Sequence, residues 1–205
     1  MSLIVIAITV CLVSAAVLFT ATAFTNRLRL VHHVTLTLVA LALYAAVLMA
    51  RPANSLITNA TVLLVALFVG SLLGRLFVNP SALVSFCITA AIVDIISSQV
   101  GATAKLSHDF QTGSSALLQY LSLSFNVHEQ LRPIVGLSDL IIITAIYFAL
   151  RQAGHVGLPA FAAPVTGLLL ALAVGLLLGG FAALPFIAAT TVAFVMLTRN
   201  RIQDA

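Results

Sequence analysis

Two aspartates stand inside long apolar runs of the sequence, and their residue type and position make them the best candidates for chemistry. The chain has five acidic residues, and only Asp94 in "AIVDIISS" and Asp139 in "IVGLSDLI" lie within such runs. A charge at the centre of a membrane costs about 3 kcal/mol on insertion scales, so intramembrane carboxylates usually mark a functional path or site. The alternative for either aspartate alone is a structural hydrogen bond within a helical bundle.

Two carboxylates that lie close together cannot easily both ionise, so we expect such a pair to share one proton. One member can then activate water as a general base while the protonated member polarises a carbonyl group, as in an aspartic protease. The alternative is a proton or cation path, in which acids load and release ions as access alternates. The spacing of the two residues does not decide between these functions.

Composition indicates what surrounds these acids. Of the 205 residues, 62% are hydrophobic and 7% are charged, and the mean hydropathy is +1.21. Such values are typical of integral membrane proteins. The apolar runs lack the alternation of barrel strands, and backbone groups in hydrocarbon need internal partners, so the runs predict helices. The predicted fold class is all-α, with a single transmembrane domain over residues 1–205.

Seven apolar runs are long enough to cross about 30 Å of hydrocarbon as helices. The first run has the apolar core of a secretory signal, but it lacks a positive leading region and is too long, so we expect it to be retained. A loop is predicted at 99–132. The seven spans are expected at 3–24, 31–50, 55–78, 81–98, 133–150, 158–178 and 181–198.

Basic residues predict the orientation, because cytoplasmic loops carry an excess of Lys and Arg. If the amino terminus is external, six basic residues fall on the cytoplasmic side and three on the other. We therefore predict a cytoplasmic carboxyl terminus and an external loop 99–132. The sequence has no basic face with interleaved aromatic residues, so we expect no nucleic acid partner. The cytoplasmic residues are Arg27, Arg29, Arg75, Arg151, Arg199 and Arg201, and the external ones are Arg51, Lys105 and Arg132.

Cysteine and histidine give no metal or disulfide pattern. Cys11 and Cys87 lie in different apolar runs without CxxC spacing, which favours small buried hydrophobic residues. The five histidines fall in predicted loops or at the ends of predicted spans. We therefore expect no metal and no organic cofactor. A serine nucleophile at Ser138 is disfavoured for a related reason, since no histidine base is predicted at membrane depth.

The predicted spans place the two aspartates at similar depth. Asp94 lies four residues before the expected end of its span at 98, and Asp139 lies six residues after the expected start of the next span at 133. At 1.5 Å per residue, these depths are about 6 and 9 Å from the same outer face. The two helices run antiparallel and contain no basic residue. If the helices are neighbours, the two carboxylates meet.

The two aspartate motifs and "AALPFIA" in the last span resemble, in order and setting, the presenilin and signal peptide peptidase intramembrane aspartyl proteases. Members of that family carry one catalytic aspartate in a helix often reading Tyr-Asp, the second in Gly-x-Gly-Asp, and a Pro-Ala-Leu motif in the final helix. The resemblance covers residues 81–198. The second motif matches at Gly136, Leu137, Ser138 and Asp139, and the third matches at Ala183, Leu184 and Pro185.

The chain also departs from the family pattern. Val93 replaces the tyrosine, Ser138 replaces the second glycine, and Ala182 stands where the leading proline would be. Ser138 adds a hydroxyl beside Asp139 and removes the conformational freedom of glycine, which is expected to alter rate or cleavage preference without abolishing the pair. The family commonly has nine spans, and this chain resembles the last seven.

The resemblance implies hydrolysis of peptide bonds within transmembrane helices, with Asp94 and Asp139 as catalytic residues and Gly136 and the Ala183 to Pro185 segment shaping the site. An external catalytic loop and a cytoplasmic carboxyl terminus are similar to signal peptide peptidase and opposite to presenilin. The implied substrates are single-span membrane proteins or signal-peptide-like helices whose amino end is cytoplasmic. Without long appended domains, the chain is expected in a prokaryotic cell membrane.

The loop and the last span contain two further features. The run "QYLSLSFNV" at 119–127 alternates apolar and polar residues, which predicts a strand near the membrane surface. Its edge, with Leu121 and Leu123, is expected to hold an unwound substrate by main-chain pairing; the alternative is an interfacial segment resting on lipid. Pro185 is expected to open the last helix locally, either as a wall of the site or as a simple kink.

Overall fold

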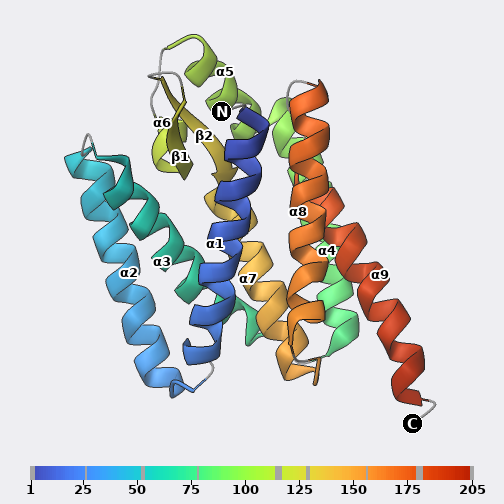
Figure 1. The fold of residues 1–205 in the computed structure, drawn as a ribbon. Helices are drawn as coiled ribbons and strands as arrows, with labels where there is room; N and C mark the ends of the chain where they lie inside the picture. The colour runs from blue at the N-terminus through green and yellow to red at the C-terminus, as the bar shows by residue number, and fades with distance from the viewer. Residues whose placement is uncertain are drawn as a thin grey trace.

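The computed structural model describes residues 3–25, 27–51, 54–77, 79–113, 117–127, 130–155, 157–178 and 182–203. Long helices lie side by side, and a short hairpin and two short helices gather at one end of the bundle, where the amino terminus also lies (Figure 1). The long helices are α1 Leu3–Thr25, α2 Leu30–Ala50, α3 Ser55–Gly74, α4 Pro80–Val100, α7 Leu137–Gln152, α8 Leu158–Leu178 and α9 Leu184–Gln203. The elements at the end of the bundle are α5 Ala102–Gln111, α6 Leu117–Tyr120, β1 Ser122–Val127 and β2 Gln130–Gly136.

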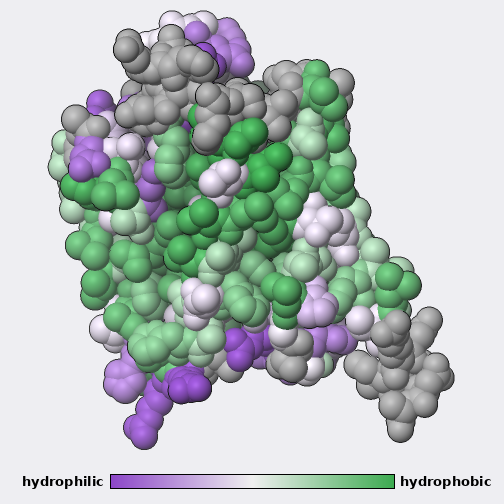
Figure 2. Space-filling model, in the orientation of Figure 1, coloured by the Kyte–Doolittle hydropathy of each residue, from purple (hydrophilic) through white to green (hydrophobic). Residues whose placement is uncertain are grey.

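Five helical segments in the described part of the chain are long and apolar enough to cross a membrane by length and composition. They correspond to α1, α2, α3, α8 and the segment Pro80–Gln111, which joins α4 to α5. α7, with 16 residues, and the apolar stretch Leu184–Thr198 of α9 are shorter. On the face shown in Figure 2, hydrophobic side chains dominate the middle of the molecule and hydrophilic ones gather toward its two ends. The protein is therefore built as a membrane-embedded helical bundle.

The hairpin corrects the predicted fifth span. Residues 133–136 are extended and belong to β2, so the helix begins at Leu137 and not at residue 133. β2 pairs antiparallel with β1. The strand predicted over 119–127 is confirmed for Ser122–Val127 only, because residues 119 and 120 belong to α6. Ile134 and Val135 are β-branched and fit a strand at least as well as a helix, and pairing with β1 decides between the two. The bundle is thus not purely helical.

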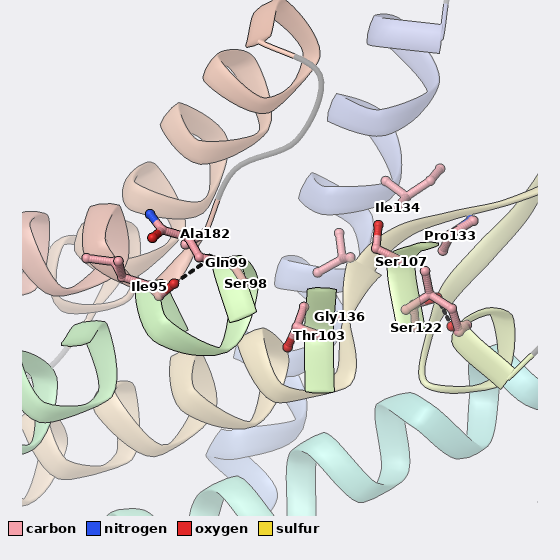
Figure 3. A pocket seen from close by; sticks show the side chains of 12 residues that line it. Ile95, Ser98, Gln99, Thr103, Ser107, Ser122, Pro133, Ile134, Gly136 and Ala182 are labelled. Atoms are coloured by element: carbon pink, nitrogen blue, oxygen red, sulfur yellow. Dashed lines mark hydrogen bonds between the residues drawn. The ribbon is translucent and has the colours of Figure 1, made fainter. Parts of the chain in front are cut away.

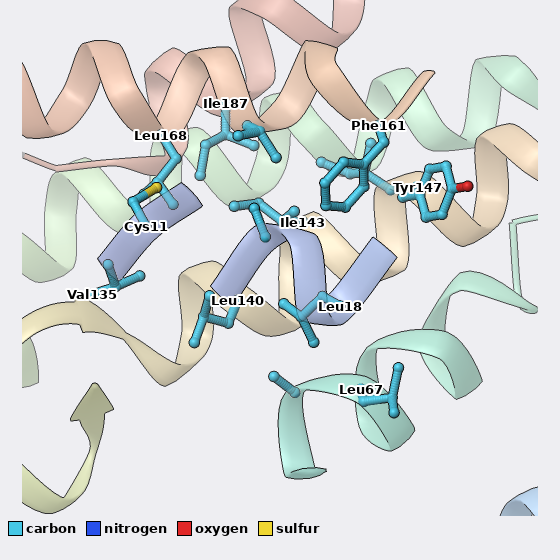
Figure 4. Packing of buried hydrophobic residues seen from close by; sticks show 14 of the residues in the cluster. Cys11, Leu18, Leu67, Val135, Leu140, Ile143, Tyr147, Phe161, Leu168 and Ile187 are labelled. Atoms are coloured by element: carbon cyan, nitrogen blue, oxygen red, sulfur yellow. The ribbon is translucent and has the colours of Figure 1, made fainter. Parts of the chain in front are cut away.

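α7 is the central helix of the bundle, because side chains and backbone of several other helices pack closely around it. A Cβ added to Gly70 of α3 would lie 2.6 Å from the Ile141 backbone oxygen, and one added to Gly74 would lie 2.6 Å from that of Ala145. Small residues let two helix backbones approach closely. In Figure 4 the buried side chains around α7 come from α1, α3, α8 and α9. Contact with α3 therefore fixes the position of α7.

The two cysteines belong to this apolar packing. Cys11 of α1 and Cys87 of α4 are each 1% exposed and are not joined in a disulfide. Cys11 lies among buried hydrophobic side chains in Figure 4. The prediction that both are small buried hydrophobic residues is confirmed.

Candidate functional site

Asp94 of α4 and Asp139 of α7 line one cavity of about 470 Å³. The two carboxylates are close enough for their charges to interact. The cavity lies beneath α5 and the hairpin, and its other lining residues carry no charge. The fold therefore brings together the two acids that stand out in the sequence. The residues around them are Ser98, Thr103, Leu106, Leu118, Leu121, Gly136, Leu137, Ser138, Ile141, Ala182 and Ala183.

Asp139 lies in the first turn of α7, as its third residue. This corrects the predicted depth, because the stretch before Leu137 is a strand and not a helical turn. The first turn of a helix has free backbone N–H groups and the positive end of the helix dipole, so it is a favourable place for an anion. The fold thus supplies part of the compensation that a carboxylate needs in an apolar setting.

Gly136 borders Asp139 closely. Its backbone angles, φ −67° and ψ 146°, are open to any residue. A Cβ at this position, however, would lie 3.0 Å from Oδ2 of Asp139. Glycine is therefore needed here for space and not for its conformational freedom.

Ser138 corrects the expectation based on glycine's freedom. The residue lies inside α7, and the only described non-glycine residue with a positive φ is Arg51. A serine at this position therefore loses nothing in backbone conformation. Ser138 lines the same cavity as the two aspartates, so its hydroxyl adds a polar group to the site.

Asp94 is held by the start of α9. The backbone N–H of Leu184, the first residue of α9, donates a hydrogen bond of 3.0 Å to Oδ2 of Asp94. The first N–H groups of a helix have no partner within the helix, so Asp94 satisfies one of them from another element. The Ala183, Leu184 and Pro185 segment therefore lies directly beside Asp94.

Pro185 does not kink a span, which corrects the prediction. It is the second residue of α9 and stands at the helix start. A proline at the beginning of a helix costs no internal hydrogen bond, and its fixed φ suits the first turn. The backbone one turn before Pro185, at residue 181, lies outside the described residues. Pro185 therefore helps α9 begin beside Asp94.

Each acid thus lies at the amino-terminal end of a helix. Asp139 lies in the first turn of α7, and Asp94 contacts the first residue of α9. Such contacts stabilise an anion by about 0.3–1 kcal/mol, and by up to about 2 kcal/mol in partly buried sites. The cost of a carboxylate at mid-membrane is about 3 kcal/mol. The two helix ends therefore offset a substantial part of that cost.

A second chamber of about 660 Å³ adjoins the aspartate cavity on the hairpin side. Figure 3 shows its lining, which comes from the end of α4, from α5, from the hairpin and from Ala182. The lining is uncharged and rich in hydroxyl and amide groups. The chamber shares Ser98, Thr103, Leu118, Gly136 and Ala182 with the aspartate cavity, and its further polar residues are Gln99, Ser107 and Ser122.

Both strands of the hairpin contribute to this chamber, Ser122 from β1 and residues 133–136 from β2. Asn59 of α3 occupies the outer edge of β1: its Nδ2 donates to the Ser124 oxygen at 2.8 Å, and its Oδ1 accepts from the Ser124 N–H at 2.9 Å. Within the described residues the sheet has only two strands, so the other edge of β2 has no strand beside it. Residues 133–136 of β2 line the chamber.

The two leucines predicted to bind substrate have different positions. Leu123 is 1% exposed, and its side chain belongs to the hydrophobic core. Leu121 lines the aspartate cavity. The strand turns the Leu123 side chain inward, so this residue lies in neither cavity lining, and its predicted role at the substrate stays a prediction.

The described histidines lie outside both cavities. His33 is at a span end as predicted but is fully buried, with Nε2 2.8 Å from the Ser71 hydroxyl oxygen. This pair joins α2 to α3. Within the described residues, no three His, Cys, Asp or Glu side chains form a group that could hold a metal ion.

The sequence interpretation missed the role of Asn59. It is the one amide side chain in the predicted span 55–78, a signal similar to the one that singled out the two aspartates. The hydroxyl residues of the chamber gave no such signal, because they lie in a stretch rich in Ser and Thr.

Comparison with known proteins finds no relative of this chain. No family model matches the sequence. No curated protein and no solved structure matches it either. What the site does is therefore inferred from its own geometry.

Proposed function

We propose that this protein is an intramembrane aspartyl protease that hydrolyses peptide bonds within transmembrane helices. The observation that carries the proposal is the pair Asp94 and Asp139, which share one cavity with no basic residue in its lining. Two such carboxylates hold one proton between them. The three motifs that resemble the presenilin and signal peptide peptidase family contribute their residues to this cavity or to its border, which supports the same function.

In the proposed mechanism the ionised aspartate takes a proton from water, and the resulting hydroxide adds to the substrate carbonyl. The tetrahedral adduct then collapses as the aspartate that took the proton passes it to the amide nitrogen, the C–N bond breaks, and the pair again holds one proton. The protonated aspartate donates a hydrogen bond to the carbonyl oxygen and stabilises the charge that develops there. The Leu184 N–H holds the Asp94 carboxylate in place for this step. The hydroxyl-lined chamber provides a polar route for water to reach the pair.

The hairpin supports a way to hold the substrate. A helical peptide bond is shielded by its own turn, so the helix must be unwound before water can attack. An unwound segment can pair with an exposed strand edge through main-chain hydrogen bonds. Because Asn59 occupies β1 at Ser124, we assign this role to β2, whose residues 133–136 line the chamber.

The proposal includes the orientation and the number of spans. We propose that α7 and α9 also cross the membrane, which gives seven spans. The hairpin end then faces outside and the carboxyl terminus faces the cytoplasm, as the basic residues favour. Substrates are accordingly single-span proteins or signal-peptide-like helices with a cytoplasmic amino end.

A second candidate function is proton- or cation-coupled transport through the same two acids. The observation that favours it is the lack of any basic partner in the cavity lining, since ion pathways use acids that load and release charge. A protease is expected to cleave its substrate when purified in detergent, where no ion gradient exists. A transporter is expected to cleave nothing under these conditions.

The deciding experiment compares wild type with Asp94→Asn and Asp139→Asn on a synthetic single-span substrate in detergent. In Asp94→Asn the amide oxygen can still accept the Leu184 hydrogen bond, so the fold is expected to persist. We expect each variant to lose about 10²- to 10⁴-fold in kcat, the usual contribution of a general acid or base. Asp109→Asn is the matched control, because Asp109 lies in α5 and outside both cavities.

Full activity in either aspartate variant would refute the protease assignment. If wild type cleaves none of several substrates but carries protons or cations into liposomes, and both variants abolish that flux, the transporter is the correct function.

A further inference from the structure

Asn59 is a buried amide in the second turn of α3 that acts as a clamp on the hairpin. The residue is 6% exposed, and its side chain makes both hydrogen bonds to Ser124, at 2.8 and 2.9 Å. The N–H and C=O of one strand residue point to the same edge, so Asn59 takes the place of a neighbouring strand. Ser124 lies opposite Pro133 of β2, and both of its backbone groups face away from β2 toward α3. Asn59 therefore satisfies the two groups of Ser124 that no strand of the sheet can reach.

The clamped segment leads directly to Asp139. The N–H of Leu137, the first residue of α7, donates to the Leu121 oxygen at 2.9 Å. Residues 121–124 are thus joined to α3 at one end and to the start of α7 at the other. A shift of this segment would therefore move the helix start that carries Asp139.

α3 contacts α7 and the hairpin at separate places along its length. Its Gly70 packs against the backbone at Ile141, two residues beyond Asp139, and its Asn59 holds Ser124. A single rigid helix therefore defines where the hairpin lies relative to the Asp139 carboxylate.

We propose that Asn59 is a positioning residue that sets which peptide bond of a bound substrate meets the aspartate pair. This inference rests on the proposed protease function. Asn59 lines neither cavity; it acts through β1, whose pairing with β2 places the β2 edge. If the clamp is lost, the hairpin moves relative to Asp139, and the substrate segment aligned on it moves with it. Displacement by about 1 Å at a catalytic site costs about 10²-fold in rate.

The test compares wild type with Asn59→Leu, which has similar size and makes neither hydrogen bond. Thr61→Val is the matched control, because Thr61 is also buried in α3 and its hydroxyl bonds only to carbonyls of its own helix. The measurements are the product masses from a synthetic single-span substrate, kcat per folded protein, and hydrogen exchange at the Ser124 amide.

For Asn59→Leu we expect cleavage spread over neighbouring bonds, a tenfold to hundredfold lower kcat, and faster exchange at Ser124. For Thr61→Val we expect wild-type products and a kcat within about twofold of wild type. If Asn59→Leu does not fold, Asn59→Asp replaces it, since it keeps the acceptor for the Ser124 N–H and loses the donor. The same spread of products is expected from this variant.

A purely structural role for Asn59 would lower the amount of folded protein without changing the product masses. Unchanged masses together with an unchanged kcat per folded protein would therefore overturn the positioning role alone. Absence of cleavage by wild type would instead overturn the protease function, and the positioning role with it.

Discussion

Gly136→Ala is the most direct probe of the space around Asp139. The backbone angles at Gly136 accept any residue. The added methyl group would lie 3.0 Å from Asp139 Oδ2, while the next atoms, Ser138 Oγ and Asp139 Cγ, are 3.5 and 3.7 Å away. The carboxylate is therefore the only group that must move.

The size of the effect follows from that distance. Ordinary contact begins at 3.4 Å, so the Asp139 carboxylate must shift by about 0.4 Å. If 1 Å of misplacement costs about 10²-fold, a shift of this size costs roughly sixfold in kcat, or about 1 kcal/mol. Stability should change little, because replacing glycine reduces the entropy of the unfolded chain wherever the backbone angles suit alanine.

The assay measures kcat at saturating substrate and thermal unfolding by circular dichroism on the same preparations. Gly113→Ala is the control, since Gly113 has φ +71° and a Cβ there would meet nothing within 4 Å. We expect this control to lose about 1 kcal/mol of stability to backbone strain and to keep its kcat. A wild-type kcat in Gly136→Ala, or a larger loss of stability than in Gly113→Ala, would show that the added methyl group does not displace the Asp139 carboxylate alone.

Other substitutions and labelling experiments test the fold around the site. Gly74→Val should prevent stable folding, because its Cβ would lie 2.6 Å from the Ala145 backbone oxygen. The yield of folded protein and the thermal melting of its helices measure this effect. A melting curve like that of wild type would contradict the close packing of α3 on α7. Tyr44→Phe removes a 3.0 Å hydrogen bond to the backbone just before the hairpin, which should cost about 1 kcal/mol in denaturant unfolding. Cys11 and Cys87, each 1% exposed, should resist maleimide in mild detergent and react after unfolding. Cleavage should follow a bell-shaped pH profile, because only the singly protonated pair is active; a flat profile would argue against proton sharing.

Local sequence determined the features that depend on local physics. A long apolar run forms a membrane helix whatever surrounds it, because backbone groups in hydrocarbon must bond within their own segment. Rare carboxylates such as Asp94 and Asp139 stand out against such runs. The strand at Ser122–Val127 was predictable from period two, since alternation places apolar side chains on one face.

Local sequence does not determine the structure of a segment that suits both a strand and a helix. Residues 133–136 are apolar and continue into an apolar helix, so hydropathy cannot separate strand from helix there. Their partner, β1, decides the matter. Likewise, hydropathy places Pro185 inside a span, whereas the structure places it at the helix start.

Which polar groups meet was decided only by the tertiary structure. The Leu184 N–H and the Asp94 carboxylate are 90 residues apart in the chain, and the Asn59 amide and Ser124 are 65 apart. Each of these groups needs a partner because it is withdrawn from water. The need can be read from the sequence, but the partner depends on how the helices pack, and that packing brings α9 to Asp94 and α3 to the hairpin.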